Sequence, residues 1–361
     1  MRLDSVADLM SDFLSGVSIP VDPERIDREL AKLWEPDEAP EGEAAAVTRH
    51  TLSNIVFLLP CSGCPEAARD LVLGVGRRFP SRIIILGRMA AAPQGPSLAA
   101  YITAVCHAAR PGSPRVCCEQ ITLEARSGEW DVFPGAVAAL LVPDVPASLV
   151  LLHEEEAALE PLLDLVDRVV FDSRGLPLEA LSKPLSILER ETSVNVDDLA
   201  WRGIRGWRRV LCDIFDEPRA RPLLATLARI EVVHGPGGAA SGALLAGWLA
   251  SRIERTPRVE LRASAAPSSG SRLASVHLEG GAGMGTAFLT VKKAEGARVV
   301  RIEYHTEDVC VIPRTVPHEE ENDAELLGGA LERTTHQGVL HGALRAACGS
   351  ATASRESSGR Q

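Results

Sequence analysis

Two cysteines two residues apart lie in the segment LLPCSGCPEAARD, between a run typical of a strand and one typical of a helix. Pro65, directly after Cys64, suits the first position of that helix. A thiol at a helix N-terminus has a lowered pKa, which is how thioredoxin-type sites activate their attacking cysteine. Cys61 and Cys64 are therefore a candidate redox pair, with two unreactive loop cysteines as the commoner explanation of a single CxxC match. Zinc would need two further ligands, and the adjacent Cys117 and Cys118 do not form a second such pair.

A glycine-rich turn in VVHGPGGAASGALLAGW follows a strand-like run and precedes a helix-like run. Gly235, Gly237 and Ala240 fit the pattern G-x-G-x-x-A, in which backbone N–H groups approach a pyrophosphate at a helix start. Gly235, Gly237 and Gly238 are thus candidate anion-binding residues. The turn lacks the lysine of a P-loop, and such a match is weak in a chain with 30 glycines. A purely structural turn is the favoured interpretation.

The segment DDLAWRGIRGWRRVLCDIFDEP, from Asp197 to Pro218, holds two of the chain's five tryptophans and four of its arginines. Its large apolar side chains recur at steps of three and four residues, as on one face of a helix, while its arginines lie on another face. We expect the apolar face to anchor the helix in its own domain and the arginine face to meet a partner, since Trp and Arg dominate interface hot spots. The candidate partner-binding residues are Trp201, Arg202, Arg205, Trp207 and Arg208.

Two glycines, Gly203 and Gly206, interrupt this predicted helix. Each costs roughly 1 kcal/mol relative to alanine in a helix interior. A cost of that kind usually means that another backbone approaches closely. We therefore expect one short helix packed tightly against a neighbouring segment.

The sequence carries no motif for catalysis. G-x-S-x-G and H-E-x-x-H are absent, and the nine histidines are scattered, with no acid at a useful spacing from His336 or His341. We expect a chain with no catalytic residue, no metal and no cofactor. A missing motif does not exclude an enzyme, however, because active sites are assembled in space.

The charge of the chain constrains its partners. Its 38 Lys and Arg against 49 Asp and Glu give a net charge of -11, which argues against nucleic acid because phosphate binding needs a basic surface. The N-terminal MRLDSVADLMSDFLSG carries acids and no unbroken apolar run, and the most apolar run, GAVAALLV, is too short for a bilayer. We expect a cytoplasmic protein that binds neither nucleic acid nor membrane, with most of its eight cysteines reduced.

The elements that must position these residues suggest two domains, since 361 residues are too many for one ordinary core. A capped helix in DPERIDRELAKLW and an acidic linker are expected over residues 1–45. TLSNIVFLLP, PEAARDLVLGVGRRF and SRIIILGR then alternate strand, helix and strand, as in a parallel sheet with crossover helices. SLAAYITAVCHAA and RVCCEQITLEA are expected to form an edge pair. We predict a Rossmann-like α/β domain over residues 46–192.

The second half predicts a C-terminal mixed α/β domain over residues 193–348. A strand, the glycine-rich turn, a helix and a further strand come before four strand-like runs, and the alternation in RVVRIEY suits antiparallel strands with one wet face. Two helices, from Glu319 and from Gln337, follow. The polar residues 349–361 are expected to be a disordered tail. The predicted class is α/β.

Four segments resemble, in the same order, parts of the glucose-6-phosphate dehydrogenase assembly protein family, OpcA. LLVPDVP resembles the family's LLxPDxP, DRVVFDSR its xRVIxDS, and ALLAGWLASRI its xLLAGWLAxRL. The Trp- and Arg-rich segment resembles DLxWxRxxxWR, through Asp198, Leu199, Trp201, Trp207 and Arg208. One departure is that the family often has paired tryptophans in the strand after PDxP, where this chain has Leu151 and Leu152.

The resemblance implies a non-catalytic assembly factor and allosteric activator of glucose-6-phosphate dehydrogenase in the oxidative pentose phosphate pathway. In cyanobacteria the family is linked to thioredoxin-dependent control, but the matched segments contain no CxxC, so this property does not transfer to Cys61 and Cys64. Two alternatives stay open on the residues alone. One is a nucleotide- or sugar-phosphate-binding enzyme using the Gly235–Gly242 turn, and the other is a CxxC thiol redox protein.

Overall fold

The structure is a computed structural model, and it describes most of the chain. The described residues are 19–32, 47–49, 51–59, 66–88, 97–108, 115–126, 130–152, 159–190, 193–264, 272–282, 285–294, 297–306 and 313–358. The chain divides into two compact units, Met1–Phe171 and Asp172–Gln361. Cys61 and Cys64 lie outside the described residues.

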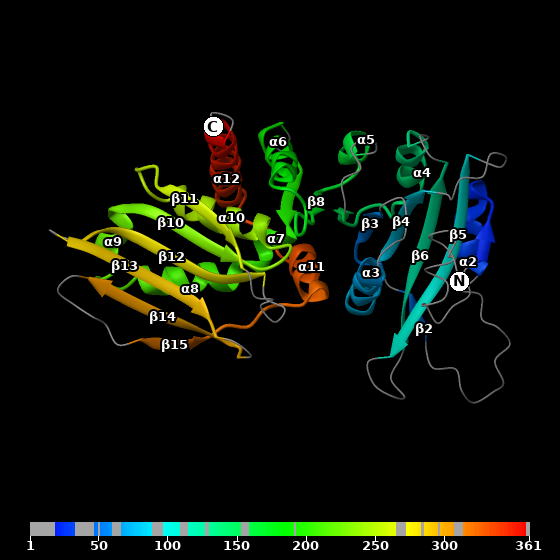
Figure 1. Cartoon of the computed structure of the whole chain (residues 1–361). Helices are drawn as coiled ribbons and strands as arrows, with labels where there is room; N and C mark the ends of the chain where they lie inside the picture. Colours follow the sequence, from blue (N-terminus) through cyan, green and yellow to red (C-terminus); the bar gives the residue numbers. More distant parts are fainter. Residues whose placement is uncertain are drawn as a thin grey trace. The chain divides into compact units, whose positions relative to one another are not determined.

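The first unit is built on a mixed sheet with the strand order β1-β5-β6-β4-β3-β7-β8, and β2 pairs with β6 (Figure 1). The pairs of β3 with β4 and β7, and of β6 with β4, are parallel, whereas β5 pairs with β6 in the antiparallel sense. The predicted parallel core is thus confirmed, and so is the pairing of β5 with β6. Their place at the edge was wrong, because β1 pairs with the outer side of β5. The strands are β1 (Ile19–Val21), β2 (Val47–Arg49), β3 (Asn54–Leu58), β4 (Arg82–Arg88), β5 (Leu98–Ala108), β6 (Arg115–Ala125), β7 (Ala147–Leu151) and β8 (Arg168–Phe171).

The central strands of this sheet are continuous apolar runs because both of their faces are buried, as every residue of β3 and β7 is. The described helices of the unit are α2 (Ile26–Lys32), α3 (Glu66–Arg78), α4 (Val132–Leu140) and α5 (Leu159–Leu163). One buried ion pair, between Arg82 Nη2 and Glu119 at 2.8 Å, links β4 to β6. Asp144, in the turn before β7, adopts a left-handed φ of 62°, a conformation that aspartate tolerates better than most residues.

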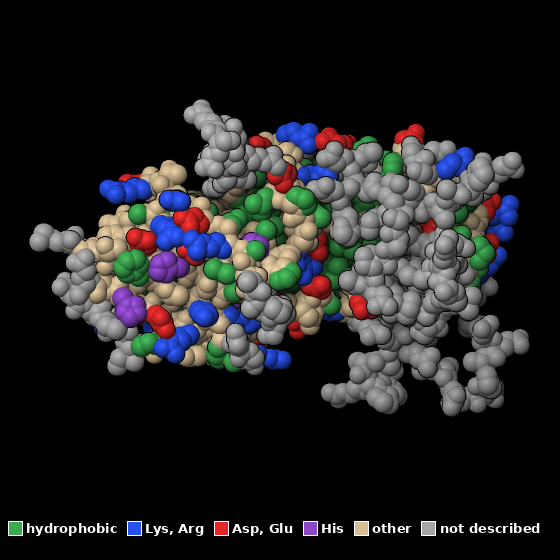
Figure 2. Space-filling model, in the orientation of Figure 1, with side chains coloured by type: hydrophobic (Ala, Val, Ile, Leu, Met, Phe, Trp, Pro, Cys, Tyr) green, Lys and Arg blue, Asp and Glu red, His purple; other side chains and the backbone are tan. Residues whose placement is uncertain are grey.

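The second unit is built on a six-stranded mixed sheet in the order β11-β10-β12-β13-β14-β15. Only the pair of β10 and β11 is parallel, so the predicted run of antiparallel strands is confirmed for its described part. The burial pattern of β14 alternates, and Figure 2 shows side chains of both charges spread over this side of the unit. The strands are β10 (Leu227–His234), β11 (Arg258–Ala263), β12 (Leu273–Ala282), β13 (Gly285–Lys293), β14 (Val299–Thr306) and β15 (Arg314–Pro317), with a short β9 (Asn195–Asp198) before them.

Helix α10 (Ala239–Ala250) lies between the sheet and the C-terminal helix α12 (Gln337–Ser358) (Figure 1). It is apolar all round and buried from Ala240 to Leu249, as expected of a helix covered on every side. A Cβ atom at Gly247 would meet the backbone carbonyl of Ala343, so glycine lets α10 and α12 approach closely.

The remaining helices of the second unit surround this pair. They are η2 (Leu178–Leu181), α6 (Ser182–Arg190), α7 (Leu199–Gly203), α8 (Arg205–Phe215), α9 (Arg221–Ala225) and α11 (Asp323–Glu332). The segment predicted to be a disordered tail is instead the last part of α12 as far as Ser358. Among the described residues, no helix has both the length and the hydropathy needed to cross a bilayer. The α/β class is confirmed for both units, and the Rossmann-like description of the first stays a prediction.

Candidate functional site

The Trp- and Arg-rich segment forms two helices rather than the predicted one. Asp198 caps the first of them, α7, because its carboxylate accepts hydrogen bonds from the N–H groups of Ala200 (2.7 Å) and Trp201 (3.4 Å). The chain leaves helical geometry at Ile204, whose φ and ψ are -91° and 7°, and α8 starts at Arg205. This break changes the directions of the side chains that the spacing alone had placed on common faces.

Three of the five predicted partner-binding residues are buried inside the second unit. Trp201 and Trp207 are 2% and 1% exposed, so they anchor α7 and α8 as the apolar face was expected to do. Arg202 is 8% exposed and pairs with the buried carboxylate of Asp197 through its Nε, at 2.8 Å. Their burial counts against all three as contact residues, although Arg202 reaches the lining of two grooves described below.

The Arg202–Asp197 pair belongs to a closed polar cluster. Arg202 Nη2 also donates to the backbone carbonyl of Arg333 and to Thr335 Oγ1. The Thr335 hydroxyl donates in turn to Asp197 Oδ2 at 2.6 Å. A buried ion pair is favourable only when further hydrogen bonds satisfy its remaining atoms, and this cluster supplies them. It ties α7 to the loop between α11 and α12.

Arg208 is largely buried but has no carboxylate partner among the described residues. Its guanidinium lies over the ring of Trp201, 3.5 Å from the ring centre, and Nη2 donates to the Trp201 carbonyl at 3.3 Å. Its Nε is buried without any hydrogen-bond partner. Burial lowers the pKa of Arg208 to about 10, because a cation away from water is destabilised. Arg208 is thus an uncompensated charge, not an exposed contact residue.

Glycine is needed at position 206 because a side chain, not a backbone, packs against it. A Cβ atom there would lie 2.7 Å from Cε1 of His318, a buried imidazole that also packs edge-on against Trp207 with ring centroids 5.1 Å apart. At Gly203 the nearest atom to such a Cβ is Leu326 Cδ1 at 4.0 Å, an ordinary contact. The expectation of a close backbone at these two glycines was therefore wrong.

A second buried acid lies next to this cluster. Burial raises the pKa of Asp198 to about 7; the Ser173 hydroxyl, which donates to Asp198 Oδ2, opposes the rise, and the charge of Asp172 adds to it. Asp172 itself pairs with Arg174 at 2.6 Å, and Arg174 also pairs with Asp323 at the start of α11. These contacts hold the N-terminus of α7 inside the unit.

The arginines that remain exposed on α8 are Arg205 and Arg209, one helical turn apart. Neither makes an ion pair or a side-chain hydrogen bond with any described residue. Each lines two separate grooves of the second unit, so the two side chains form a ridge between them. We call the pair the arginine ridge.

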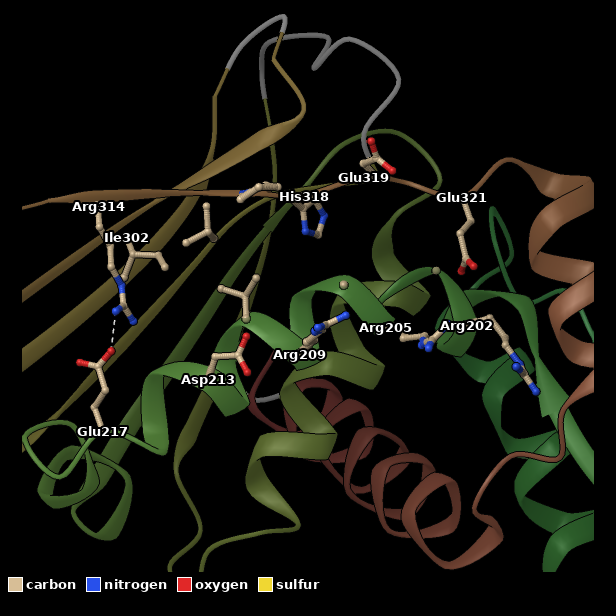
Figure 3. Close-up of a pocket in the computed structure, with 15 residues that line it drawn as sticks. Arg202, Arg205, Arg209, Asp213, Glu217, Ile302, Arg314, His318, Glu319 and Glu321 are labelled. Carbon is tan, nitrogen blue, oxygen red and sulfur yellow. Dashed lines mark ion pairs between the residues drawn. The ribbon is translucent and has the colours of Figure 1, made fainter.

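The first groove, which we call the sheet-edge groove, has a volume of about 610 Å³ and lies between α8 and strands β14 and β15 (Figure 3). Figure 3 shows Glu217 pointing towards Arg314, with which it pairs at 2.5 Å. The charges of its lining balance, with four arginines and four carboxylates. They are Arg202, Arg205, Arg209 and Arg314 against Asp213, Glu217, Glu319 and Glu321.

The second groove, which we call the arginine cleft, has a volume of about 1000 Å³ and lies between α8, the end of α10 and the loop before α12. Its charges do not balance, since six arginines line it and Asp216 is its single carboxylate. The arginines are Arg202, Arg205, Arg208, Arg209, Arg252 and Arg333. Arg252 and Arg333 could not be found from the sequence, because they come from segments about 45 and 125 residues further along the chain with no periodic signal.

The glycine-rich turn uses its N–H groups within the chain. The N–H of Gly235 donates to the carbonyl of Arg272 at 3.0 Å, and that of Gly238 to the carbonyl of Gly235 at 3.1 Å. Gly237 has a φ of 68°, and its carbonyl accepts from the N–H of Gly175 at 3.0 Å. A Cβ at Gly238 would meet the Arg272 carbonyl. These contacts explain the three glycines as a packed turn and occupy two of the donors that an anion would need.

Burial raises the pKa of the Cys118, Cys212 and Cys348 thiols, so none of these three is an activated thiol. Cys118 is buried and Cys212 is exposed on α8. Partial burial raises the pKa of Cys212, and the carboxylates of Asp216 and Asp213 raise it further. Among the described side chains, no group of three or more His, Cys, Asp and Glu is placed to hold a metal ion.

Two family models match the chain in consecutive segments. Residues 74–190 match the N-terminal domain of the glucose-6-phosphate dehydrogenase subunit family, and residues 194–344 match the C-terminal domain of the same family. Asp198, Trp201, Trp207 and Arg208, which belong to one of the four segments of the sequence resemblance, lie in the second match. In the structure they build the α7–α8 turn.

Curated relatives named OxPP cycle protein OpcA are similar over part of their length. The protein from Nostoc punctiforme is 29% identical over 205 residues, which are 54% of this chain and 42% of that protein. The protein from a Synechocystis species is 27% identical over 49% of this chain and 38% of its own length. The chain therefore spans about two fifths of the curated relatives that it matches.

Solved oxidoreductase structures align with most of the chain, at TM-scores of 0.40 and below. An NAD binding oxidoreductase from Klebsiella pneumoniae is 11% identical, with a TM-score of 0.40 over 84% of this chain and 98% of that one. The oxidoreductase yvaA from Bacillus subtilis is 9% identical, with a TM-score of 0.38 over 84% and 98%. Likeness at these scores carries no argument about function.

Proposed function

This chain belongs to the OpcA family of glucose-6-phosphate dehydrogenase assembly proteins, and on that premise we propose that it binds glucose-6-phosphate dehydrogenase and promotes the active form of that enzyme without catalysing a reaction itself. The observation that carries the proposal is the consecutive match of both halves, residues 74–190 and 194–344, to the two domains of that family. Its role would be that of an allosteric activator in the oxidative pentose phosphate pathway.

The physical mechanism is preferential binding. If the chain binds the active conformer or oligomer of the enzyme more tightly than the inactive one, it shifts the population by the ratio of the two affinities and by no more. A shift from one part in a hundred active to ninety-nine parts would require a ratio of about 10⁴. Activation therefore saturates once every enzyme molecule is bound.

The contact surface that we propose is the arginine ridge. Arg205 and Arg209 are exposed, unpaired within the described chain and fixed on a helix whose other face is anchored by Trp207. Arginine at the centre of an interface contributes strongly when a partner's carboxylates desolvate it. This surface retains Arg205 from the sequence prediction, adds Arg209, and leaves out Trp201, Arg202, Trp207 and Arg208 because they support the fold.

The test is a kinetic one. Glucose-6-phosphate dehydrogenase from the same organism is assayed with increasing amounts of the chain, and complex formation is followed by sizing. We expect the wild-type chain to raise kcat or lower KM to a plateau, and the Arg205→Glu, Arg209→Glu double variant to remain folded and give no activation.

The matched control reverses two charges elsewhere on the same unit. Lys292 and Arg255 are exposed and line neither groove, so the Lys292→Glu, Arg255→Glu variant should activate normally. Normal activation by the Arg205, Arg209 variant would reject the ridge as the contact surface. No activation and no complex with the wild-type chain would reject the function itself.

A further inference from the structure

The arginine cleft concentrates positive charge in a chain whose net charge is -11. Of the six arginines that line it, only Arg202 is neutralised by a described carboxylate, that of Asp197. Arg205, Arg209, Arg252 and Arg333 make no ion pair among the described residues, and Asp216 is the single acid in the lining. Clustered like charges repel one another, so such an arrangement is stabilised when an anion enters it.

The buried, unpaired guanidinium of Arg208 further favours binding of an anion. Its guanidinium is held against Trp201, largely out of water, and it lines the cleft without a counter-charge. The nearby carboxylate of Asp197 is already occupied by Arg202 and by Thr335. A buried charge without a partner is destabilising, and an oxyanion bound in the cleft would compensate it.

Much of the remaining lining is apolar, beside Cys212, Thr334, Thr335 and His336. Trp248 and Phe215, each 9% exposed, together with Leu249 form a recessed floor to which Leu224 and Val339 contribute. The volume of about 1000 Å³ is at the upper end of the range of small-molecule sites, which typically combine an apolar lining with a few polar groups that fix the ligand. The floor would cover an uncharged body attached to the anion.

We propose that the arginine cleft binds a small phosphate ester, with its phosphoryl group among the arginines and its apolar or aromatic body on the Trp248 floor. A phosphoryl dianion compensates more of the unpaired charge than a single carboxylate, and it matches the planar fork of arginine. The site is distinct from the glycine-rich turn, where the N–H groups of Gly235 and Gly238 are used internally. It also exists in the isolated chain, so it does not depend on the partner proposed above.

Because Arg205 and Arg209 line the cleft and also form the arginine ridge, ligand and partner would share two side chains. Any effect of the ester on partner binding must then be matched by an equal effect of the partner on ester binding. A phosphate ester bound in the cleft would therefore change the affinity of the chain for its proposed partner.

The experiment is isothermal titration of the full-length chain, alone, with phenyl phosphate at constant ionic strength. Inorganic phosphate, which lacks the ring, and benzoate, which lacks the second charge, are titrated in parallel. We expect saturable binding of phenyl phosphate, about tenfold or more tighter than that of either comparator, and a weakening as salt is raised. Phenyl phosphate should also raise the unfolding temperature of the chain in proportion to its occupancy.

The variants avoid Arg208, since its stacking on Trp201 would mix binding with folding. Arg252→Ala and Arg333→Ala remove exposed side chains that make no ion pair in the described chain. Neither should lower the unfolding temperature without ligand, and each should weaken the binding of phenyl phosphate about tenfold. Arg255→Ala, an exposed arginine outside the cleft, should bind as the wild type does.

Three results would overturn the proposal. The first is no saturable binding at tens of millimolar phenyl phosphate, and the second is equal binding by wild type, Arg252→Ala and Arg333→Ala. The third is a chain that ignores phenyl phosphate while Arg252→Ala weakens its complex with glucose-6-phosphate dehydrogenase, which would make the cleft a protein interface. Titration of the chain alone tests whether the cleft binds a phosphate ester, and the activation assay tests the proposed function. The two proposals can therefore fail separately.

Discussion

The sheet-edge groove and the arginine cleft adjoin the same helix, α8, and share the arginine ridge, yet their charges are arranged differently. Four arginines face four carboxylates in the first, whereas six arginines face one carboxylate in the second. In the sheet-edge groove the acids come from the end of α8 and from the segment after β15, and Arg314 is paired with Glu217. The comparison shows that the same two exposed arginines of α8 border a lining of balanced charge on one side and a lining with excess positive charge on the other.

The difference follows from what each groove has opposite α8. Strand β15 and the residues after it bring Glu319 and Glu321, which add two carboxylates to the lining. The end of α10 and the loop before α12 bring Arg252 and Arg333, which add charge of the same sign. Proteins rarely keep a buried cation such as Arg208 unpaired without a reason, and buried groups of that kind are commonest at functional sites.

The largest loss of stability should come from breaking the buried Arg202–Asp197 ion pair, whose arginine lines both grooves. Arg202→Ala leaves Asp197 buried without its cation, and we expect a loss of about 3–5 kcal/mol in the free energy of unfolding, measured with urea. Arg205→Ala, on the exposed ridge, should change it by no more than about 0.5 kcal/mol. Equal losses in the two variants would mean that burial does not separate these arginines.

The next largest loss of stability should come from a substitution at Gly206, in the lining of the sheet-edge groove. In Gly206→Ala the new methyl group meets His318, which cannot move freely because it packs against Trp207, so we expect a loss of about 1–3 kcal/mol in unfolding free energy. Gly203→Ala is the control, because its methyl group makes an ordinary contact with Leu326 and helix propensity favours alanine by up to about 1 kcal/mol. A stable Gly206→Ala chain would contradict the tight packing of His318.

A pH effect should mark the turn that supports the cleft. The pKa of Asp198 in the folded chain, about 7, lies above the value of about 3.9 for an unfolded aspartate, so the folded chain binds more protons between these values. The contribution to stability is complete below pH 4 and is lost as pH rises through about 7, at up to about 1.4 kcal/mol per pH unit. Asp198→Asn, which still caps α7, should flatten this slope between pH 5 and 7.5 in urea unfolding. An unchanged slope would exclude Asp198 as its source.

The smallest effect should come from the exposed pair of the sheet-edge groove. Arg314 and Glu217 are each close to half exposed, so Arg314→Ala should cost no more than about 1 kcal/mol of unfolding free energy, with a smaller cost at high salt. The same variant should titrate with phenyl phosphate as the wild type does. Weaker binding would show that the two grooves are not independent in charge.

The spacing of particular residues predicted much of this arrangement. The three- and four-residue steps of Trp201, Ile204, Trp207 and Leu211 indicated a buried face, and all four are buried. The continuous apolar runs that became β3 and β4, and the alternation in β14, predicted their strands because period and burial follow from local geometry. Spacing could not predict the break at Ile204, which redirects Arg202 inward towards Asp197 and Arg208 onto Trp201.

The amino-acid sequence alone determined the class of the fold, the anchoring face of the Trp- and Arg-rich segment, and the family. Each of these depends on the order and periodicity of side chains along the chain. Which arginines are exposed, which is paired and which is buried alone could be known only from the folded chain. Those outcomes depend on groups distant in sequence, such as Thr335, Arg252 and Arg333, that packing brings beside α7 and α8. Charge compensation depends on which side chains are neighbours in space, and no local sequence pattern predicts it.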